Sequence, residues 1–397
     1  MPIVVFVLAV AVFAQGTSEF MVSGLLERIA GDVGVSLGAA GLLTSLFAAG
    51  MVLGAPVMAM AAGRLPVRYS VTAFLGVFCI AHVIGAATTG FAVLLVTRVV
   101  AAVANAGFLA IVLAVLPRLV GPALVGRATS VVVSGVTVAC IAGVPAGTLL
   151  GQVWGWRSAF WAVAVVSAAL LVPVWLMLDH DVREGGTSDG QAPPVRREWS
   201  VLRQRPILIA VLAGILVNAA TFAGFTYLGS ITTAIAGGGR WVPLALALFG
   251  VGSFLGVTIT GRYSDRHQRR IVVAGTVLLV GVWLLAAATA YALIGVMIMS
   301  TVAGAVAFGV GSTLIATIVR TATPDAPRIA GALATTAFNV GAVLGPVAAG
   351  LAVDRTEQPT TAFWCGAAFT AAAVVVAVIG EIRASIHKAD LTFAANS

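Results

Sequence analysis

The dominant pattern along this chain is a series of long apolar runs, separated by short segments that carry most of the charges, glycines and prolines. A helix of about 20 apolar residues, at about 1.5 Å per residue, crosses the hydrocarbon core of a bilayer. The pattern predicts an all-α membrane protein with twelve transmembrane helices, over residues 3–25, 37–61, 69–89, 91–116, 129–151, 158–178, 206–228, 242–261, 271–290, 293–318, 329–353 and 361–380.

Basic residues gather on one side of these predicted spans. With the N-terminus in the cytoplasm, 17 of the 22 Lys and Arg residues lie on the cytoplasmic side, Arg98 lies within a span, and Arg28, Arg157, Arg240 and Arg355 lie outside. Cytoplasmic loops of membrane proteins carry such an excess of basic residues. We therefore expect a multi-pass protein of the cell membrane with both termini in the cytoplasm.

The composition agrees with a membrane protein and excludes several other classes. Hydrophobic residues make up 60% of the chain and charged residues 9%, so a soluble domain could not bury the apolar surface. The net charge of +8 is spread over short loops, whereas a nucleic-acid surface would gather it on one module. The three cysteines lie singly in apolar runs, which predicts neither a disulfide framework nor a metal site.

One polar segment divides the spans into two sets of six. Residues 179–205 combine glycines, prolines and charged residues, as flexible linkers do. We expect the tail to be unstructured, because it is short and polar. The predicted organisation is an N-terminal half over 1–178, a cytoplasmic linker over 179–205, a C-terminal half over 206–383 and a cytoplasmic tail over 384–397.

The two predicted halves are similar to each other at an offset of 202 residues. Glycines of three span pairs coincide at this offset: Gly50 with Gly252, Gly107 with Gly309, and Gly143 with Gly345. Glycine-rich spans can also align by chance, but one offset that serves three pairs favours duplicated halves. Secondary transporters that rock one half against the other have this plan.

The segment after the eighth span reads GRYSDRHQRR at residues 261–270. It resembles the signature G-x-x-x-D-R-x-G-R-R of the major facilitator superfamily, with Gln268 where glycine is usual. The first half departs further, since Gly63 occupies the place of the acid. The resemblance implies the major facilitator fold and a cytoplasmic gate formed by Arg64, Asp265 and Arg266.

Glycine and proline patterns in the fifth and eleventh spans add to this resemblance. They are similar to the antiporter motif G-x-x-x-G-P-x-x-G-G in variant form. Glycines let helices approach closely and proline bends its own helix, which is also ordinary in membrane proteins of other function. The positions predicted to kink and pack helices are Gly143, Pro145 and Gly147 in the fifth span, and Gly341, Gly345 and Pro346 in the eleventh.

The first span carries QGTSEF at residues 15–20. This stretch resembles the first-span motif of twelve-helix drug:proton antiporters and of related exporters of sugars and purine nucleosides. Glu27 matches the spacing of a second acid in this branch. Across nearly the whole chain, the sequence resembles the chloramphenicol-efflux permeases of actinomycetes, which implies proton-coupled drug export.

Two opposite charges lie at nearly the same depth in the predicted spans, Glu19 in the first and Arg98 in the fourth. Each charge alone is unfavourable in lipid, whereas a facing pair satisfies both. Burial and a nearby cation act on the ionisation of a carboxyl group in opposite directions, so Glu19 can gain and lose a proton. We predict that Glu19 and Arg98 couple transport to protons. A fixed ion pair that never titrates is the alternative.

Amide and aromatic side chains at similar depth are candidates for the walls of a substrate cavity. Apolar walls with a few polar groups are typical of small-molecule sites. Amides within spans also bond neighbouring helices, which needs no substrate. The predicted cavity residues are Gln15, Phe20, Asn105, Asn218, Phe222, Tyr227, Phe338 and Asn339.

These features predict a secondary transporter that exports a small, largely apolar drug. The resemblance implies chloramphenicol or a related phenicol as the leading substrate and the bacterial plasma membrane as the location. The alternatives are an exporter of sugars or purine nucleosides and, from another class, an intramembrane enzyme or a receptor. No H-E-x-x-H motif occurs, and the only lysine, Lys388, lies in the tail, so the chain has no Walker A loop. We expect no enzyme activity and no cofactor, with the proton gradient as the driving force. The expected partners of the monomer are drug, protons and the lipid bilayer.

Overall fold

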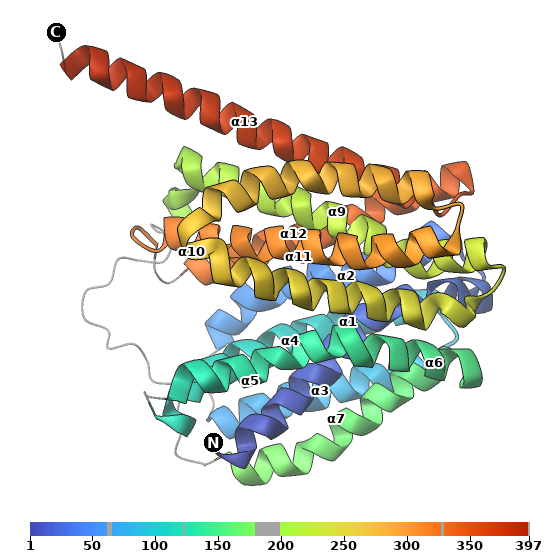
Figure 1. Ribbon diagram of the computed structural model, residues 1–397. Coiled ribbons are helices and arrows are strands. Elements are labelled where there is room, and N and C mark those ends of the chain that lie inside the picture. Colours follow the sequence, from blue (N-terminus) through green and yellow to red (C-terminus); the bar gives the residue numbers. More distant parts are fainter. Residues whose placement is uncertain (62–65, 122–123, 179–198, 327–328, 396–397) are drawn as a thin grey trace.

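The computed structural model describes residues 1–61, 66–121, 124–178, 199–326 and 329–395. Over these residues the chain forms a bundle of long helices that run side by side (Figure 1). Twelve helical segments are long and apolar enough to cross a membrane, which confirms the predicted fold class. Large apolar side chains such as Val96, Leu176 and Ile298 are exposed on the bundle, as expected for a surface that faces lipid tails.

The first six spans form the N-terminal set of helices. The fifth span is built from three consecutive pieces, α5, a π-helical turn η2 and α6. The elements are α1 (Ile3–Val33), α2 (Leu37–Ala61), α3 (Val67–Ala87), α4 (Phe91–Val120), α5 (Val125–Val138), η2 (Ala139–Gly143), α6 (Val144–Trp154) and α7 (Arg157–Met177).

The last six spans form the C-terminal set. The eighth and ninth spans are joined in one helix, α10, which bends sharply at His267 (φ −129°, ψ 23°). The elements are η3 (Trp199–Arg203), α9 (Arg205–Ala236), η4 (Gly239–Trp241), α10 (Val242–Thr289), α11 (Leu293–Ala322), α12 (Ala330–Thr356) and α13 (Thr361–Ala395).

The C-terminal tail differs from the expectation. The sequence was expected to be unstructured beyond residue 383, but α13 continues to Ala395. Alanine, which has the highest helix propensity, occurs four times in residues 384–395, and its propensity outweighs the polarity of this stretch. Most of the predicted linker, residues 179–198, lies outside the described residues.

Close helix contacts repeat between the two sets of helices at the offset of 202 residues. A Cβ atom added to Gly50 of α2 would lie 2.7 Å from the backbone oxygen of Val99 on α4. A Cβ atom added to Gly252 of α10 would lie 2.0 Å from the backbone oxygen of Thr301 on α11. Both members of the second contact stand 202 residues after those of the first, so the halves are built from the same unit.

The fifth and eleventh spans show the same relation where they meet the first and seventh. A Cβ atom on Gly143 would lie 2.0 Å from the hydroxyl oxygen of Thr17 on α1. A Cβ atom on Gly345, the residue equivalent to Gly143 in the other half, would lie 2.2 Å from the backbone oxygen of Ala219 on α9. The π-helical turn η2 ends at Gly143, two residues before Pro145, and π-bulges of this kind change the direction of a helix.

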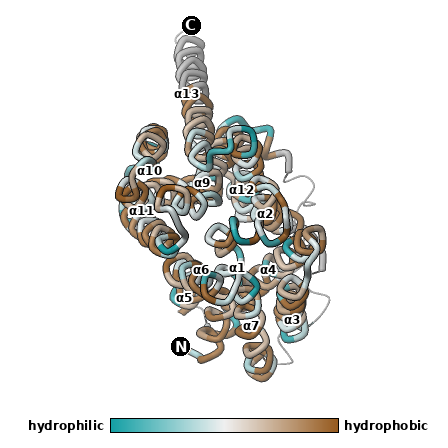
Figure 2. The backbone as a smooth tube through the Cα atoms, turned by 90° about the vertical axis from the view of Figure 1, so that its right-hand side faces the viewer, coloured by the Kyte–Doolittle hydropathy of each residue, from teal (hydrophilic) through white to brown (hydrophobic). Residues whose placement is uncertain are grey.

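The two halves share a core at the outer side only. Figure 2 looks along the bundle, with α2 beside α12 and α1 near the centre. The shared core includes Phe20 of α1 and Phe222 of α9. Toward the cytoplasm, the described residues form one core within the N-terminal half, around Leu75, and another within the C-terminal half, around Ile318. The structure is therefore closed on the outer side and divided on the cytoplasmic side.

Two polar bridges join the halves at the outer ends. The carboxylate of Asp354 on α12 accepts hydrogen bonds from the Ser36 hydroxyl (2.7 Å) and from the Gly38 amide (2.8 Å), at the N-terminus of α2. The Gln152 amide on α6 donates to the backbone oxygen of Gly239 (2.6 Å), just before α10. Gln152 and Asp354 are 202 residues apart, so the two bridges occupy equivalent places in the repeat.

The glycine contacts predict a sharp difference between two substitutions in α10. A Cβ atom on Gly256 would lie 1.9 Å from the backbone oxygen of Ala305, whereas one on Gly281 would meet nothing within 4 Å. We expect Gly256→Ala to destabilise the protein by at least about 1–3 kcal/mol, since the backbones must move apart. Gly281→Ala should leave the thermal midpoint of the detergent-solubilised protein unchanged. Equal midpoints for the two variants would contradict the packing described.

The outer bridge formed by Asp354 predicts that weakening it makes the space between the outer ends of the halves more accessible to water-soluble reagents. Asp354→Asn should let the outer ends separate more often, because the α2 N-terminus loses a charged acceptor. The measurement is the rate at which a membrane-impermeant maleimide labels Ser23→Cys in a background with Cys79, Cys140 and Cys365 replaced by alanine. We expect the rate to rise about tenfold if the bond is worth about 1.5 kcal/mol. Glu357→Gln, which also removes a charge near the end of α12, should leave the rate unchanged.

Candidate functional site

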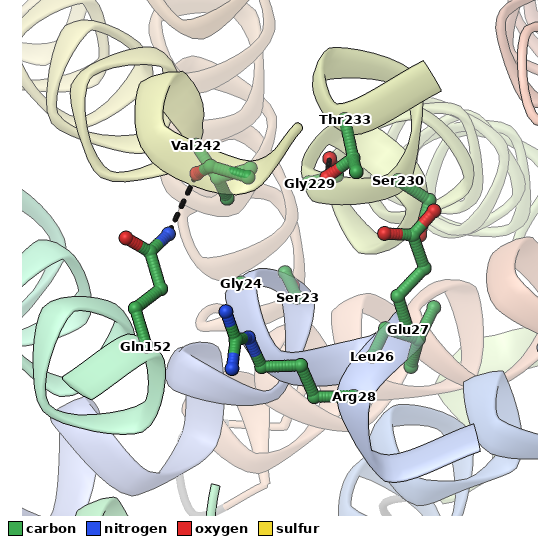
Figure 3. Close-up of a pocket in the computed structure, with 11 residues that line it drawn as sticks. Ser23, Gly24, Leu26, Glu27, Arg28, Gln152, Gly229, Ser230, Thr233 and Val242 are labelled. Carbon is green, nitrogen blue, oxygen red and sulfur yellow. Dashed lines mark hydrogen bonds between the residues drawn. The ribbon is translucent and has the colours of Figure 1, made fainter. Parts of the chain in front are cut away.

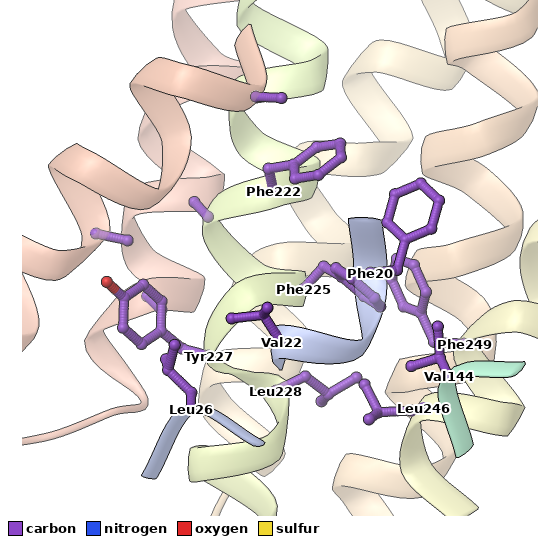
Figure 4. Packing of buried hydrophobic residues seen from close by; sticks show 14 of the residues in the cluster. Phe20, Val22, Leu26, Val144, Phe222, Phe225, Tyr227, Leu228, Leu246 and Phe249 are labelled. Carbon is purple, nitrogen blue, oxygen red and sulfur yellow. The ribbon is translucent and has the colours of Figure 1, made fainter. Parts of the chain in front are cut away.

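Glu19 lies where the two halves begin to separate. It stands at the middle of α1 and is partly exposed, whereas its neighbours Ser18 and Phe20 are buried. Phe20 contacts Phe222 and Phe225 of α9, with ring centroids 6.1 Å and 5.9 Å apart. Figure 4 shows these rings packed with Phe249 of α10. This aromatic cluster closes the interface on the outer side of Glu19.

Arg98 is buried at the same level and reaches α1 from α4. Its side chain is 1% exposed. One terminal nitrogen donates to the Ser18 hydroxyl (2.9 Å), and the other lies 3.4 Å from the backbone oxygen of Glu19. Its Nε donates to the backbone oxygen of Leu43 on α2 (3.4 Å), and its guanidinium carbon lies 4.2 Å from the centre of the Phe47 ring.

The geometry between Glu19 and Arg98 differs from a direct ion pair. The two charges are close enough to attract, but Arg98 bonds to the backbone of Glu19 and to Ser18 rather than to the carboxylate. Among the described residues, the Glu19 carboxylate has no hydrogen-bond partner. In this conformation the carboxylate is free to bind a proton or to accept a hydrogen bond from another donor, while Arg98 is held by neutral oxygens.

The sequence analysis overlooked two residues of this site, Ser18 and His82. His82 on α3 is 2% exposed, and its Nε2 lies 2.5 Å from the Ser18 hydroxyl oxygen. Its Nδ1 lies 2.7 Å from the backbone oxygen of Phe78. The available signal was a histidine in the middle of an apolar span, where polar residues are rare and usually have a role.

Some predicted cavity residues approach this site. Gln15 is buried one turn below Glu19 on α1, and neither polar atom of its side-chain amide has a hydrogen-bond partner among the described residues. Asn105 is buried on α4, the helix that carries Arg98. Phe20 and Phe222 are in contact across the two halves.

Other predicted cavity residues bind within the C-terminal half. Asn218 donates to the backbone oxygen of Phe338 (2.5 Å), and Asn339 donates to that of Thr335 (3.0 Å). Tyr227 is fully buried, and its hydroxyl donates to the backbone oxygen of Pro346 (3.1 Å). In this conformation Asn218 and Tyr227 join α9 to α12, which was the alternative for the amides, whereas Asn339 bonds within its own helix α12.

The predicted cytoplasmic gate is described only in part. Arg64 lies outside the described residues, and Asp265 and Arg266 lie within α10 with side chains outside them. Gln268, which stands where the signature has glycine, is described. It donates to the Thr317 hydroxyl and accepts from Arg320, so it links α10 to α11 at this end.

A pocket of about 390 Å³ opens at the outer ends of α1, α6, α9 and η4. Figure 3 shows Glu27 on the side of Ser230 and Thr233, with Arg28 toward Gln152. The hydroxyls of Ser23 and Ser230, which line the pocket, are buried without partners among the described residues. Glu27 lies outward of the aromatic cluster, at a different level from Glu19. In the described part of the chain, no three His, Cys, Asp or Glu side chains cluster as metal ligands would.

Two duplicated six-span halves around a buried charged site define a secondary-transporter architecture. The Major Facilitator Superfamily matches residues 8–239 and 231–390 of the chain, and the protein belongs to this family. The fold agrees with that of the solved nucleoside transporter NupG, with a TM-score of 0.81 at 12% identity over 95% of this chain and 98% of that one.

Two relatives are similar over most of their length. A chloramphenicol resistance protein of Streptomyces lividans is 46% identical over 379 residues, which cover 95% of this chain and 96% of that protein. A chloramphenicol efflux pump of Mycobacterium tuberculosis is 28% identical over 359 residues, 88% of this chain and 86% of that protein. With twelve apolar helices and these relatives, the chain is a multi-pass protein of the bacterial cell membrane.

The contacts of Arg98 predict a large effect of its removal. Arg98→Ala removes the bonds of the guanidinium to the Ser18 hydroxyl and to two helical backbone oxygens, at about 1.5–3 kcal/mol for a hydrogen bond to a charged group, and leaves the buried space of the side chain empty. We expect lower expression and a lower thermal midpoint, with partial recovery in Arg98→Lys, which keeps the charge and some donors. Arg240→Ala, at an exposed arginine, is the matched control. Equal midpoints for Arg98→Ala and Arg240→Ala would contradict this account.

Proposed function

We propose that this protein is a proton-coupled exporter of a small, largely apolar antibiotic, chloramphenicol or a related phenicol. The observation that carries the substrate is the similarity, over nearly the whole chain, to a chloramphenicol resistance protein. The relative named as a chloramphenicol efflux pump supports the direction of transport. In this proposal the protein works as a monomer, needs no cofactor and catalyses no reaction.

The surroundings of Glu19 suit a neutral solute with an aromatic ring and a few polar groups. Phe20, Phe222 and Phe225 offer ring faces and edges from both halves. The unpaired amide of Gln15 offers a donor and an acceptor one turn away. Aromatic walls with a small number of polar groups are the usual composition of sites for drug-sized molecules.

The coupling mechanism follows from the free carboxylate of Glu19. The halves are packed outward of Phe20, so we infer that the open side of Glu19 faces the cytoplasmic opening. In the proposed cycle, drug entering from the cytoplasm competes with a proton for this carboxylate, and the outward-facing state takes up the proton again. Drug and proton then move in opposite directions, and the proton gradient drives export.

An exporter of sugars or purine nucleosides is the second candidate within transport. Its substrates present more hydroxyl and amide groups, and such a cavity would need more polar partners at the level of Glu19. In the structure, Asn218 and Asn339 are engaged by backbone oxygens of their own half. This arrangement favours the less polar substrate.

The test is gradient-driven uptake of labelled chloramphenicol into everted vesicles, which corresponds to export from the cell. We expect wild-type vesicles to accumulate the label when an inward-acid pH gradient is imposed and to lose it when the gradient collapses. Glu19→Gln should reduce accumulation to the level of vesicles without the protein, because the amide cannot exchange a proton.

Glu27→Gln is the matched control for this test, since Glu27 lies on the same helix at the outer pocket. It should retain gradient-driven accumulation. Undiminished pumping by correctly folded Glu19→Gln would contradict the assignment of Glu19. Failure of the wild-type protein to accumulate any phenicol would contradict the proposed substrate.

A further inference from the structure

Ser18 and His82 form a buried hydrogen-bonded chain with Arg98, and neither was assigned a role by the sequence or the comparisons. The three side chains come from α1, α3 and α4 and are 0%, 2% and 1% exposed. Each is joined to the next by a hydrogen bond, Arg98 to Ser18 at 2.9 Å and Ser18 to His82 at 2.5 Å.

The direction of each bond follows from the groups at the two ends. The backbone oxygen of Phe78 can only accept, so Nδ1 of His82 carries the hydrogen. In the neutral ring Nε2 is then an acceptor, and the Ser18 hydroxyl donates to it. The lone pairs of Ser18 are left to accept from Arg98, whose guanidinium can only donate. Both ring nitrogens of His82 and the Ser18 hydroxyl are paired in this single arrangement.

His82 therefore fixes the rotation of the Ser18 hydroxyl. Without an acceptor at Nε2, the hydroxyl hydrogen could point toward the guanidinium, where it would repel the cation. With the acceptor in place, the lone pairs of the Ser18 hydroxyl oxygen face Arg98 and keep the guanidinium on this oxygen and on the backbone oxygen of Glu19. The Glu19 carboxylate is then left without a hydrogen bond from Arg98.

We propose that Ser18 and His82 are positioning residues that hold Arg98 away from the Glu19 carboxylate in the cytoplasm-open state, and so set the pH at which the transporter exchanges its proton. The proposal rests on the proposed function, in which Glu19 carries the proton. When Arg98 leaves Ser18, it can pair directly with the carboxylate and stabilise the ionised form. The chain from His82 to Arg98 decides between these two arrangements.

The charged and titratable groups on the elements around His82 are few in the described residues. Glu19 lies on α1 and Arg98 on α4, next to the hydrogen-bonded chain itself. The thiol of Cys140 on η2 is close enough to Glu19 to interact with it electrostatically. On α7, Arg157 is bound to Asp32 at the outer end. On α3, Cys79 bonds to the backbone oxygen of Ala164, and Arg68 lies at the cytoplasmic start over the Trp175 ring. Glu19 is therefore the titrating group that Arg98 can reach.

A purely structural role for His82 is the rival explanation. The imidazole stacks near Phe78 and Phe160, with ring centroids 4.2 Å and 5.8 Å away, and it could simply fill space between helices. Loss of packing lowers stability and activity at every pH, whereas loss of positioning moves the pH dependence. The pH dependence of transport therefore distinguishes the two explanations.

The experiment measures the pH midpoint of transport in proteoliposomes loaded with purified protein and labelled chloramphenicol. Ser18→Ala and His82→Leu should each lower the midpoint by about one pH unit, because Arg98 freed from Ser18 pairs with the Glu19 carboxylate and a higher proton concentration is needed to neutralise it. His82→Gln keeps an acceptor and should restore the wild-type midpoint in part. Cys79→Ala, one turn away on α3, should leave it unchanged.

The double variant Ser18→Ala/His82→Leu tests whether His82 acts through Ser18. Substitutions within one hydrogen-bonded network do not have additive effects, so the double variant should show the same shift of the pH midpoint as either single variant. A wild-type midpoint in the folded single variants would overturn the proposal. Additive shifts would overturn it as well, since His82 would then act independently of Ser18.

A second readout separates this proposal from the proposed function. The thermal midpoint of purified protein is measured against pH for wild type and Glu19→Gln, and the pH at which the two curves diverge reports ionisation of Glu19 without any substrate. Ser18→Ala and His82→Leu should move that pH downward by the same amount as in transport. If chloramphenicol is not carried but the divergence shifts, the substrate assignment fails and the positioning role stands. If chloramphenicol is carried and the pH of divergence stays at its wild-type value in both variants, the positioning role fails.

Discussion

A buried guanidinium is the constraint on which the arrangement of the N-terminal half depends. Arg98 lies at the middle of a bundle surrounded by lipid, where a charge without partners is very unfavourable. Three of its N–H groups donate to oxygens of α1 and α2, and its face lies over the Phe47 ring. The cation thus joins α4 to both neighbouring helices through neutral oxygens, which leaves the carboxylate of Glu19 available for exchange.

Packing within one half recurs in the other, and the outer side also packs closely between the halves. Close contacts at Gly50 and Gly143 recur 202 residues later at Gly252 and Gly345, so the two halves are built alike. Between the halves, a Cβ atom on Gly229 of α9 would lie 2.3 Å from the backbone oxygen of Ser23 on α1, and the cytoplasmic cores of the described residues are separate. Two similar units that meet on one side of the membrane and part on the other are what rocking-type alternating access requires.

The sequence predicted the twelve spans, because apolar length is dictated by the bilayer, and it predicted the repeat, because glycine contacts leave a visible spacing. It also placed Glu19 and Arg98 at one depth. It did not predict that Arg98 binds Ser18 and the backbone of Glu19, since the choice among oxygens within one helix turn depends on side-chain geometry. His82 was missed because its partner is 64 residues away on another helix. The helix beyond residue 383 was not predicted, because the polarity of this segment suggested a tail without structure.

The two outer bridges are equivalent in position but not in chemistry. Asp354 presents an exposed, charged oxygen to the start of α2, whereas Gln152 makes a neutral bond to Gly239. Dissolved ions screen the first contact and leave the second almost untouched. Rising ionic strength should therefore loosen the polar contact at the seam of α2 and α12 and leave the one between α6 and the start of α10 in place.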